Sequence, residues 1–84
     1  MTHAAKTWLE YYELQEEGEK LFELRKDDRP YKVGDYFLSQ EFDNEKNEYT
    51  GRELRYIITY ILRDADFLGL KNGYCILQLK PIDY

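Results

Sequence analysis

The sequence predicts a small α+β fold that is mainly β: a partly open β-barrel with one N-terminal helix. Three observations lead to this prediction. Segments rich in apolar and β-branched residues fill most of the chain after residue 19, short polar turns separate them, and a helical pattern occurs near the N-terminus. A small sheet avoids exposed edges by curling toward closure. The 84 residues are enough for one domain, 1–84, and not for two.

The helix is expected over residues 7–17. Trp8, Tyr11 and Tyr12 occur at positions i, i+3 and i+4, so they would share one helical face. Gly18 is a natural end for this helix, because glycine readily adopts the left-handed conformation that follows many helices. In an alternative interpretation, residues 3–8 form a short first strand that leads into the helix.

The segment 20–26 fits either a strand or a helix by its pattern alone. As a strand it places Phe22 and Leu24 on one face and Glu23 and Arg25 on the other. A helix would have to continue the preceding one through a run of polar residues and a glycine. The strand is therefore favoured, and the proline at position 30 then breaks it.

Turn residues divide the rest of the chain into three further strands. The expected elements are a turn at 33–35, a strand at 36–42, a polar hairpin loop at 43–48, a return at 49–51, a strand at 52–62, a loop with a helical turn at 63–70, a tight turn at 72–73 and a last strand at 74–82. The strand 52–62 has apolar residues on both faces, which is typical of a central strand. Its Tyr56 and Tyr60 are expected in the core.

Composition excludes several classes of protein. Cys75 is the only cysteine and His3 the only histidine, so an internal disulfide and a four-ligand zinc site are both excluded, and no metal or cofactor is expected. The net charge of −5 argues against a protein that coats duplex DNA. A lone thiol, the lack of a signal-peptide stretch and short apolar runs predict a cytoplasmic protein without a membrane partner.

The most informative spacing places Lys20, Glu23 and Arg25 on one short segment just after Gly18. A rigid strand that leaves a helix end would hold an ammonium, a carboxylate and a guanidinium within a few ångströms. Arginine forks onto phosphate, lysine adds a mobile charge, and glutamate accepts from the exocyclic amine of a base. These residue types in this order favour a binding site for RNA or a nucleotide. Two further cations, Arg29 and Lys32, would extend its basic rim.

The pattern GxKxxExR, formed by Gly18, Lys20, Glu23 and Arg25, resembles the signature of the ASCH domain, a PUA-like β-barrel named after the activating signal cointegrator. Further matching segments are His3-x-x-Lys6, Asp28-Arg29, Val33-Gly34-Asp35, Glu41, Tyr49-Thr50-Gly51-Arg52 and Gly73-Tyr74. The resemblance extends over nearly the whole chain and is greatest to short, uncharacterised bacterial and phage proteins. It implies a PUA-like barrel that binds RNA in a cleft between helix and barrel, lined by Lys20, Glu23 and Arg25.

The resemblance also implies a hydrolase alternative, with Lys20 as base or electrophile and Glu23 as its partner. Some ASCH relatives hydrolyse acetylated cytidine and others cleave RNA. The amidohydrolases place a threonine three residues after the matching lysine and take an acid from a later helical segment. This chain has Glu23 at the threonine position and only a short loop after Leu62, so binding is favoured over catalysis. A third alternative is a protein-interaction adaptor, which an exposed aromatic patch away from Lys20 would favour.

Several residues have a structural interpretation beside the functional one. The three charged groups of the motif could be a surface ion-pair lattice of little energetic weight, and Arg29 could form a structural salt bridge. Gly34 is expected to need a backbone conformation that other residues avoid, and Asp35 to cap a turn. His3, close to the terminus, is expected in solvent. The tyrosines near element ends that could stack on a base are Tyr11, Tyr12, Tyr31 and Tyr49.

Overall fold

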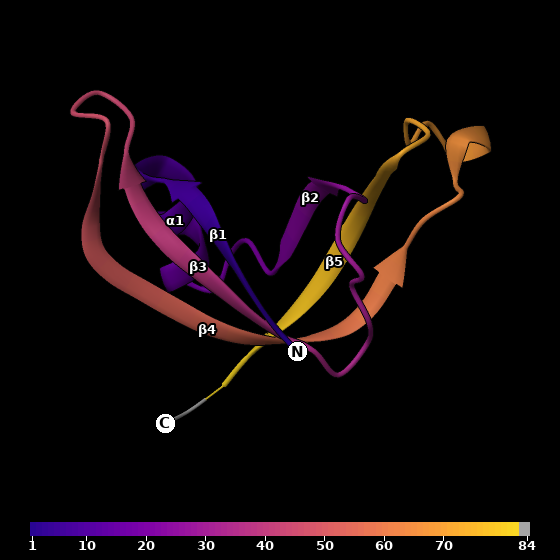
Figure 1. Cartoon of the computed structure of the whole chain (residues 1–84), viewed down its shortest axis with the longest axis horizontal. Coiled ribbons are helices and arrows are strands. Elements are labelled where there is room, and N and C mark those ends of the chain that lie inside the picture. The colour runs from indigo at the N-terminus through magenta and orange to yellow at the C-terminus, as the bar shows by residue number, and fades with distance from the viewer. Residues whose placement is uncertain (83–84) are drawn as a thin grey trace.

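The computed structural model describes residues 1–82, which form one curled sheet and one α-helix (Figure 1). The elements in chain order are β1 (Thr2–Trp8), α1 (Leu9–Glu16), β2 (Phe22–Lys26), β3 (Tyr36–Asp43), β4 (Glu48–Leu62), the short 3-10 helix η1 (Asp66–Leu68) and β5 (Tyr74–Pro81). This order confirms a mainly β fold with an N-terminal helix. It also confirms the strand over most of 20–26 and the helical turn in the loop after β4.

The five strands are arranged in the order β1-β3-β4-β5-β2. β1 runs parallel to β3, and every other neighbouring pair is antiparallel. The sheet curls into a half-barrel, so that β1 with β3 and β2 with β5 form two arms that rise from the middle of β4 (Figure 1). Because β1 and β2 are the two ends of the strand order, the open side of the half-barrel lies between them.

Two irregularities in β4 help to bend the sheet. The register with β3 shifts between Gln40 and Phe42, opposite the part of β4 that contains Gly51 at φ +92°. The register with β5 shifts where Thr59 stands as one extra residue on β4. Bulges of this kind bend a strand and increase its twist. Residues 49–51, predicted as a return before the strand, therefore belong to one long bent strand, which begins at Glu48.

The bulge at Thr59 also decides which tyrosines are buried. Tyr56 is 2% exposed, whereas Tyr60 is 55% exposed. An extra residue shifts the two-residue alternation by one position, so side chains beyond it change face. The prediction that Tyr56 lies in the core is confirmed, and the same prediction for Tyr60 is wrong. Ile61 replaces Tyr60 as the side chain that packs against the core.

The first strand extends into residues 7 and 8, where the helix was predicted to begin. Thr7 and Trp8 are paired in register with Glu41 and Phe42 of β3, so they belong to β1 and not to the helix. The alternative of a short first strand is therefore confirmed. The prediction that Trp8, Tyr11 and Tyr12 share one helical face is wrong, because Trp8 belongs to β1. The helix ends before a glycine as expected, since the residue at position 18 has φ +79°.

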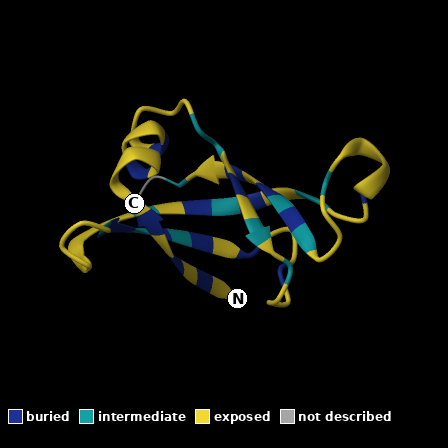
Figure 2. Cartoon of the chain, turned by 90° about the horizontal axis from the view of Figure 1, so that it is seen from above, coloured by how far each residue is buried: buried dark blue, intermediate teal, exposed yellow. Residues whose placement is uncertain are grey.

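The core lies inside the curl and comes from β1, β3, β4, β5 and the segment before β3. Buried and exposed positions alternate along much of the strands (Figure 2). The core cluster consists of Ala5, Tyr31, Phe37, Tyr56, Ile58, Cys75, Leu77 and Leu79. Burial raises the pKa of the Tyr56 hydroxyl to about 12 and also raises the pKa of the Cys75 thiol. The thiol therefore serves as apolar filling of the core.

His3 is buried, and the prediction that it lies in solvent is wrong. It is 4% exposed because alternate residues of β1 point into the core. Its Nε2 lies 2.8 Å from Oδ2 of Asp35, and its ring centroid lies 4.7 Å from that of Tyr31. The other Asp35 oxygen is 3.2 Å from the ammonium of Met1. Asp35 thus gives the buried imidazole a polar partner and holds the start of β1 beside β3.

Asp35 also caps its turn, as predicted. Its Oδ2 accepts a hydrogen bond from the backbone N–H of Lys32 at 3.1 Å, and Gly34 between them has φ +97°. The hydrogen bond with His3, helped by the amino terminus and by the Lys32 N–H, lowers the pKa of the Asp35 carboxyl below its ordinary value of 3.8. A carboxylate whose pKa is lowered by folding stabilises the folded state at higher pH, and that contribution is lost as the pH falls through the lowered pKa.

We therefore expect Asp35→Asn to be less stable than the wild type at neutral pH, and the difference to narrow as the pH falls below about 4. The measurement is the free energy of unfolding in urea between pH 7 and pH 2.5 for both proteins. Asp66→Asn, at an exposed position of η1, serves as the control. Its free energy of unfolding should differ from that of the wild type by a small amount that does not change with pH. A difference for Asp35→Asn that stays constant down to pH 2.5 would contradict this assignment.

Candidate functional site

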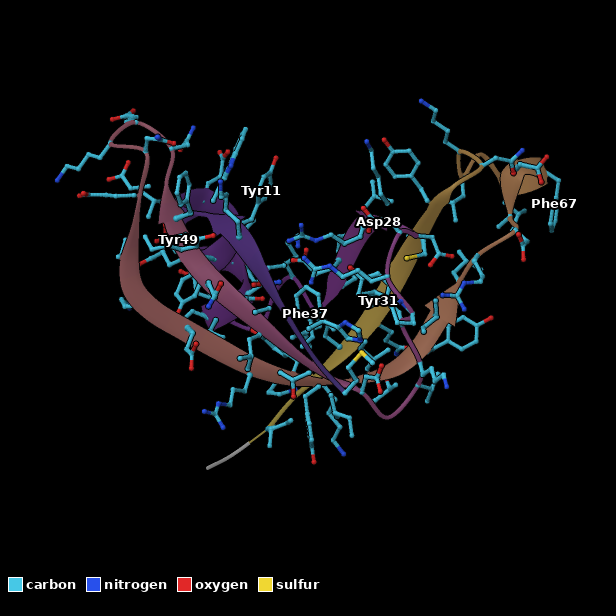
Figure 3. The ribbon with its side chains drawn as sticks, viewed as in Figure 1. Tyr11, Asp28, Tyr31, Phe37, Tyr49 and Phe67 are labelled. Atoms are coloured by element: carbon cyan, nitrogen blue, oxygen red, sulfur yellow. The ribbon has the colours of Figure 1, made fainter. Side chains whose placement is uncertain are left out.

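A pocket of about 760 Å³ opens between the end of β1, the helix α1 and the strand β2. It lies on the open side of the half-barrel, where Tyr11 projects from α1 (Figure 3). Its lining residues come from three consecutive segments: Lys6, Thr7, Trp8, Tyr11, Leu14, Glu19, Lys20, Phe22, Glu23, Leu24 and Arg25. The three residues of the predicted motif, Lys20, Glu23 and Arg25, are therefore all at this pocket.

Glu23 is the centre of a hydrogen-bonded cluster on the pocket floor. Its Oε1 accepts from Lys20 Nζ at 3.0 Å and from Gln15 Nε2 at 2.7 Å, and its Oε2 accepts from Arg25 Nε at 3.0 Å. The carboxylate is on a residue only 5% exposed. A buried charge is tolerated when opposite charges and hydrogen bonds compensate for its lost hydration. The predicted convergence of the three charged groups is confirmed, and the helix contributes a fourth member, Gln15.

The strand β2 turns its charged face inward and its apolar face outward. Phe22 is 47% exposed and Leu24 is 56% exposed, although alternation alone would assign the apolar face to the core. The inward direction of Arg25 has a structural reason. Its Nη2 donates to the carbonyl of Lys6 at 2.9 Å, across the open side of the half-barrel. The predicted alternation of β2 is therefore confirmed, but its buried face is the polar one.

Arg29 makes a second contact of the same kind. Its Nη1 donates to the carbonyl of Ala4 at 3.0 Å, two residues before the carbonyl that Arg25 reaches. Two guanidinium groups thus join β1 to β2 and the segment after it, where a closed barrel would have a backbone ladder. We call these two hydrogen bonds the arginine seam. Arg29 therefore has a structural role, as the alternative interpretation expected. Its partner is a backbone carbonyl, however, and not the carboxylate of a salt bridge.

Two of the predicted cations lie outside the pocket. Arg29 belongs to the seam, and Lys32 lies in the turn before β3, where its backbone bonds Asp35. The structure therefore brings together Lys20, Glu23 and Arg25 but not Arg29 and Lys32. The sequence pattern could not separate them, because the chain reverses direction after β2 and carries residues 29–32 toward the start of β1.

Aromatic side chains form the pocket walls above this floor. The rings of Trp8 and Tyr11 are nearly parallel, with centroids 6.5 Å apart and an angle of 22°. Lys20 Nζ lies 5.7 Å from the centroid of Tyr11 and 5.0 Å from that of Phe22, so the ammonium sits between rings of the helix and of β2. Cation–π contacts of this length favour a held ammonium. The pocket therefore combines flat apolar walls with a cationic group.

Sequence reasoning anticipated Tyr11 but missed Trp8 and Phe22. Trp8 was expected on a helical face shared with Tyr11 and Tyr12, and Phe22 on the strand face opposite Glu23 and Arg25. Of the other tyrosines considered as stacking platforms, Tyr12 is 2% exposed and Tyr31 is 4% exposed, so both belong to the interior. A signal for Phe22 was present, because its neighbours in sequence, Lys20 and Glu23, were already predicted to line the site.

A second polar cluster lies where β3 and β4 pass the end of α1. Thr50 Oγ1 donates to Glu41 Oε1 at 2.6 Å, and Arg52 bonds the carboxylate of Glu16 while its Nη1 lies 3.7 Å from Glu41 Oε2. The carboxylate of Glu16 raises the pKa of the Arg52 guanidinium. These contacts join the end of α1 to β3 and β4, so we assign this cluster a structural role.

Within residues 1–82, no group of three or more His, Cys, Asp and Glu side chains is placed to hold a metal ion. Neither described helix combines the length and the apolar character needed to cross a bilayer.

The fold and the pocket together define a class: a small curled-sheet protein whose open side carries an aromatic pocket with an ion-paired floor. The chain belongs to the family DUF3850, a domain of unknown function, whose model matches residues 2–79. The match includes every strand in whole or in large part and all residues that line the pocket. No curated protein matches the sequence.

Proposed function

We propose that this protein is a cytoplasmic RNA- or nucleotide-binding module of the ASCH type within the PUA-like barrels, and that the ligand enters the pocket between α1, β1 and β2. A base stacks against the aromatic walls, and a phosphate or carbonyl oxygen meets Lys20 and Arg25. The observation that carries the proposal is the position of the Lys20 ammonium between the rings of Tyr11 and Phe22 at the floor of a pocket of about 760 Å³.

The pocket suits a single flat ring better than a duplex. Stacking of one base on an aromatic side chain contributes about 1–3 kcal/mol and tolerates different bases. The lining holds the cations Lys6, Lys20 and Arg25 and the anions Glu19 and Glu23, so the local charge is only slightly positive within a chain of net charge −5. Few phosphates can therefore be neutralised, and affinity should depend weakly on salt, with a slope of about −0.7 per phosphate contact on a single strand.

The only tryptophan of the chain, Trp8, lies on the pocket wall and provides a direct readout. We expect its fluorescence to be quenched by nucleoside monophosphates or a short single-stranded RNA at low salt, because a stacked base changes the surroundings of the indole. Lys20→Met should weaken this binding about tenfold, since a hydrogen bond from a charged donor is lost. Phe22→Ala should weaken it by about tenfold through lost stacking.

Two variants outside the pocket serve as matched controls. Lys46→Met removes an exposed ammonium from the β3–β4 hairpin, and Phe67→Ser removes an aromatic side chain that is 80% exposed in η1. Both should bind as tightly as the wild type. No quenching by any nucleotide or RNA, or equal binding by wild type and Lys20→Met, would refute the proposal.

Analysis of the ligand after the titration distinguishes the hydrolase alternative from a binding module. A binding module returns RNA and acetylated cytidine intact. Turnover that disappears in Glu23→Gln would instead identify an enzyme.

One observation favours a protein-interaction adaptor as a second candidate. Phe67 and Leu68 are 80% and 71% exposed in η1, at the opposite end of the curled sheet from Tyr11 (Figure 3). Exposed apolar side chains that adjoin one another are typical of contact surfaces. If no nucleotide or RNA quenches Trp8 fluorescence, the nucleotide-binding proposal fails and this second candidate is preferred.

A further inference from the structure

At the pocket floor, more hydrogen-bond donors than acceptors remain unused. Lys20 has three N–H donors and uses two, on the carbonyl of Phe22 at 2.8 Å and on Glu23 at 3.0 Å. Arg25 has five and uses two, on Glu23 and on the carbonyl of Lys6. The two cations therefore keep about four donors for a ligand.

The acceptor at the floor is nearly exhausted. The carboxylate of Glu23 offers about four acceptor positions, and three are taken by Gln15, Lys20 and Arg25. The carbonyl of Lys6 uses one of its two acceptor positions in the arginine seam. The amide oxygen of Gln15 has no partner among the described residues, but Gln15 is not one of the residues that line the pocket. Glu19 is the remaining carboxylate of the lining, but it is exposed in the loop after α1 and is therefore hydrated. The deep part of the pocket thus presents donors, and the acceptor lies at its mouth.

A second, independent observation points to a ligand at this place. Thr7 lines the pocket and is only 4% exposed, yet its Oγ1 has no hydrogen-bond partner among the described residues. Buried hydroxyl groups are nearly always hydrogen-bonded to protein or to ordered water, so the unpaired Thr7 hydroxyl beside the pocket is a group that a ligand could satisfy directly or through a water molecule. A hydroxyl both donates and accepts, so Thr7 adds a polar contact without changing the balance at the floor.

We infer that the pocket selects keto bases, such as hypoxanthine, guanine and uracil, over their amino counterparts adenine and cytosine. This inference rests on the proposed nucleotide-binding function and extends it to the class of base. A keto oxygen accepts from the free donors of Lys20 and Arg25. An exocyclic amino group at the same position would face those donors and find the Glu23 carboxylate already engaged.

The test compares matched ligands that differ only in the keto or amino group and the protonation of the adjoining ring nitrogen. Inosine and adenosine 5′-monophosphates differ in the C6 substituent and the adjoining N1 proton, and uridine and cytidine 5′-monophosphates form the corresponding pyrimidine pair. We expect Trp8 fluorescence titrations to give about tenfold tighter binding of the keto member in each pair, because a charged donor meets an acceptor in one case and a donor in the other.

Lys20→Met tests the source of the preference, and Lys46→Met, which removes an exposed ammonium outside the pocket, is its control. In Lys20→Met the keto/amino ratio should fall toward one, whereas in Lys46→Met it should remain about tenfold. Circular dichroism verifies that both variants are folded.

Equal affinities within each pair, tighter binding of the amino members, or a ratio that survives Lys20→Met would overturn this inference and leave the proposed function standing. If none of the four monophosphates and no RNA binds, the proposed function fails, and the base preference fails with it.

Discussion

Replacement of Glu23 by alanine is expected to destabilise the protein by about 3 kcal/mol. Glu23 is 5% exposed and accepts hydrogen bonds from Gln15, Lys20 and Arg25, so its removal leaves two cations without their counter-charge and an amide without its acceptor. Removing one partner of a buried ion pair costs more than the pair contributes, because the remaining charge is left uncompensated. Urea unfolding monitored by circular dichroism measures the loss.

The control for this experiment is Glu19→Ala, which removes an exposed carboxylate of the same pocket four residues earlier. It should change the free energy of unfolding by no more than about 0.5 kcal/mol. Glu23→Gln keeps the shape of the side chain and one acceptor oxygen, so it should be destabilised less than Glu23→Ala. If Glu23→Ala were as stable as Glu19→Ala, the cluster would be a surface lattice and not the support of the pocket floor.

Phe37→Ala is expected to cost about 3–5 kcal/mol, the range found when a buried phenylalanine is truncated. Phe37 has 0% exposure and pairs with His3 on one side and Tyr56 on the other, so it occupies the middle of the core. An 84-residue domain has a total stability of roughly 4–13 kcal/mol. The variant should therefore be close to unfolding at ambient temperature, and its thermal midpoint should fall by 10 °C or more, by a conversion of about 4–8 °C per kcal/mol.

The same substitution should weaken ligand binding even where the variant remains folded. The guanidinium carbon of Arg25 lies 5.8 Å from the centroid of the Phe37 ring, so this ring is the surface on which one arm of the arginine seam rests. Tyr36→Ala is the control, at the neighbouring half-exposed position of β3. It should change the unfolding equilibrium constant and the ligand dissociation constant by no more than a factor of a few. Similar losses from Tyr36→Ala and Phe37→Ala would contradict the assigned core.

The local parts of the fold could be predicted from sequence. The strand at Phe22–Lys26 followed from alternation, the end of the helix from Gly18, and the turn at 72–73 from an asparagine–glycine pair, each of which depends on a few neighbouring residues. The convergence of Lys20, Glu23 and Arg25 also followed from local geometry, because side chains two residues apart on a strand lie on one side.

The missed features depend on partners that are distant in the chain. Thr7 and Trp8 extend the first strand because β3 pairs with them in parallel, and local helical spacing could not reveal that pairing. The exposure of Tyr60 results from one extra residue opposite β5. Trp8 was therefore absent from the predicted site, although the structure places it on the pocket wall.

The arginine seam has a consequence for self-association. A strand at the end of a sheet presents unpaired carbonyl and N–H groups, and a second chain can dock on them and start a fibre. Here the carbonyls of Ala4 and Lys6 are occupied by Arg29 and Arg25 of the same molecule. The guanidinium groups thus block the pairing of another polypeptide with this edge strand. The half-barrel can therefore stay open for a ligand without serving as a template for aggregation.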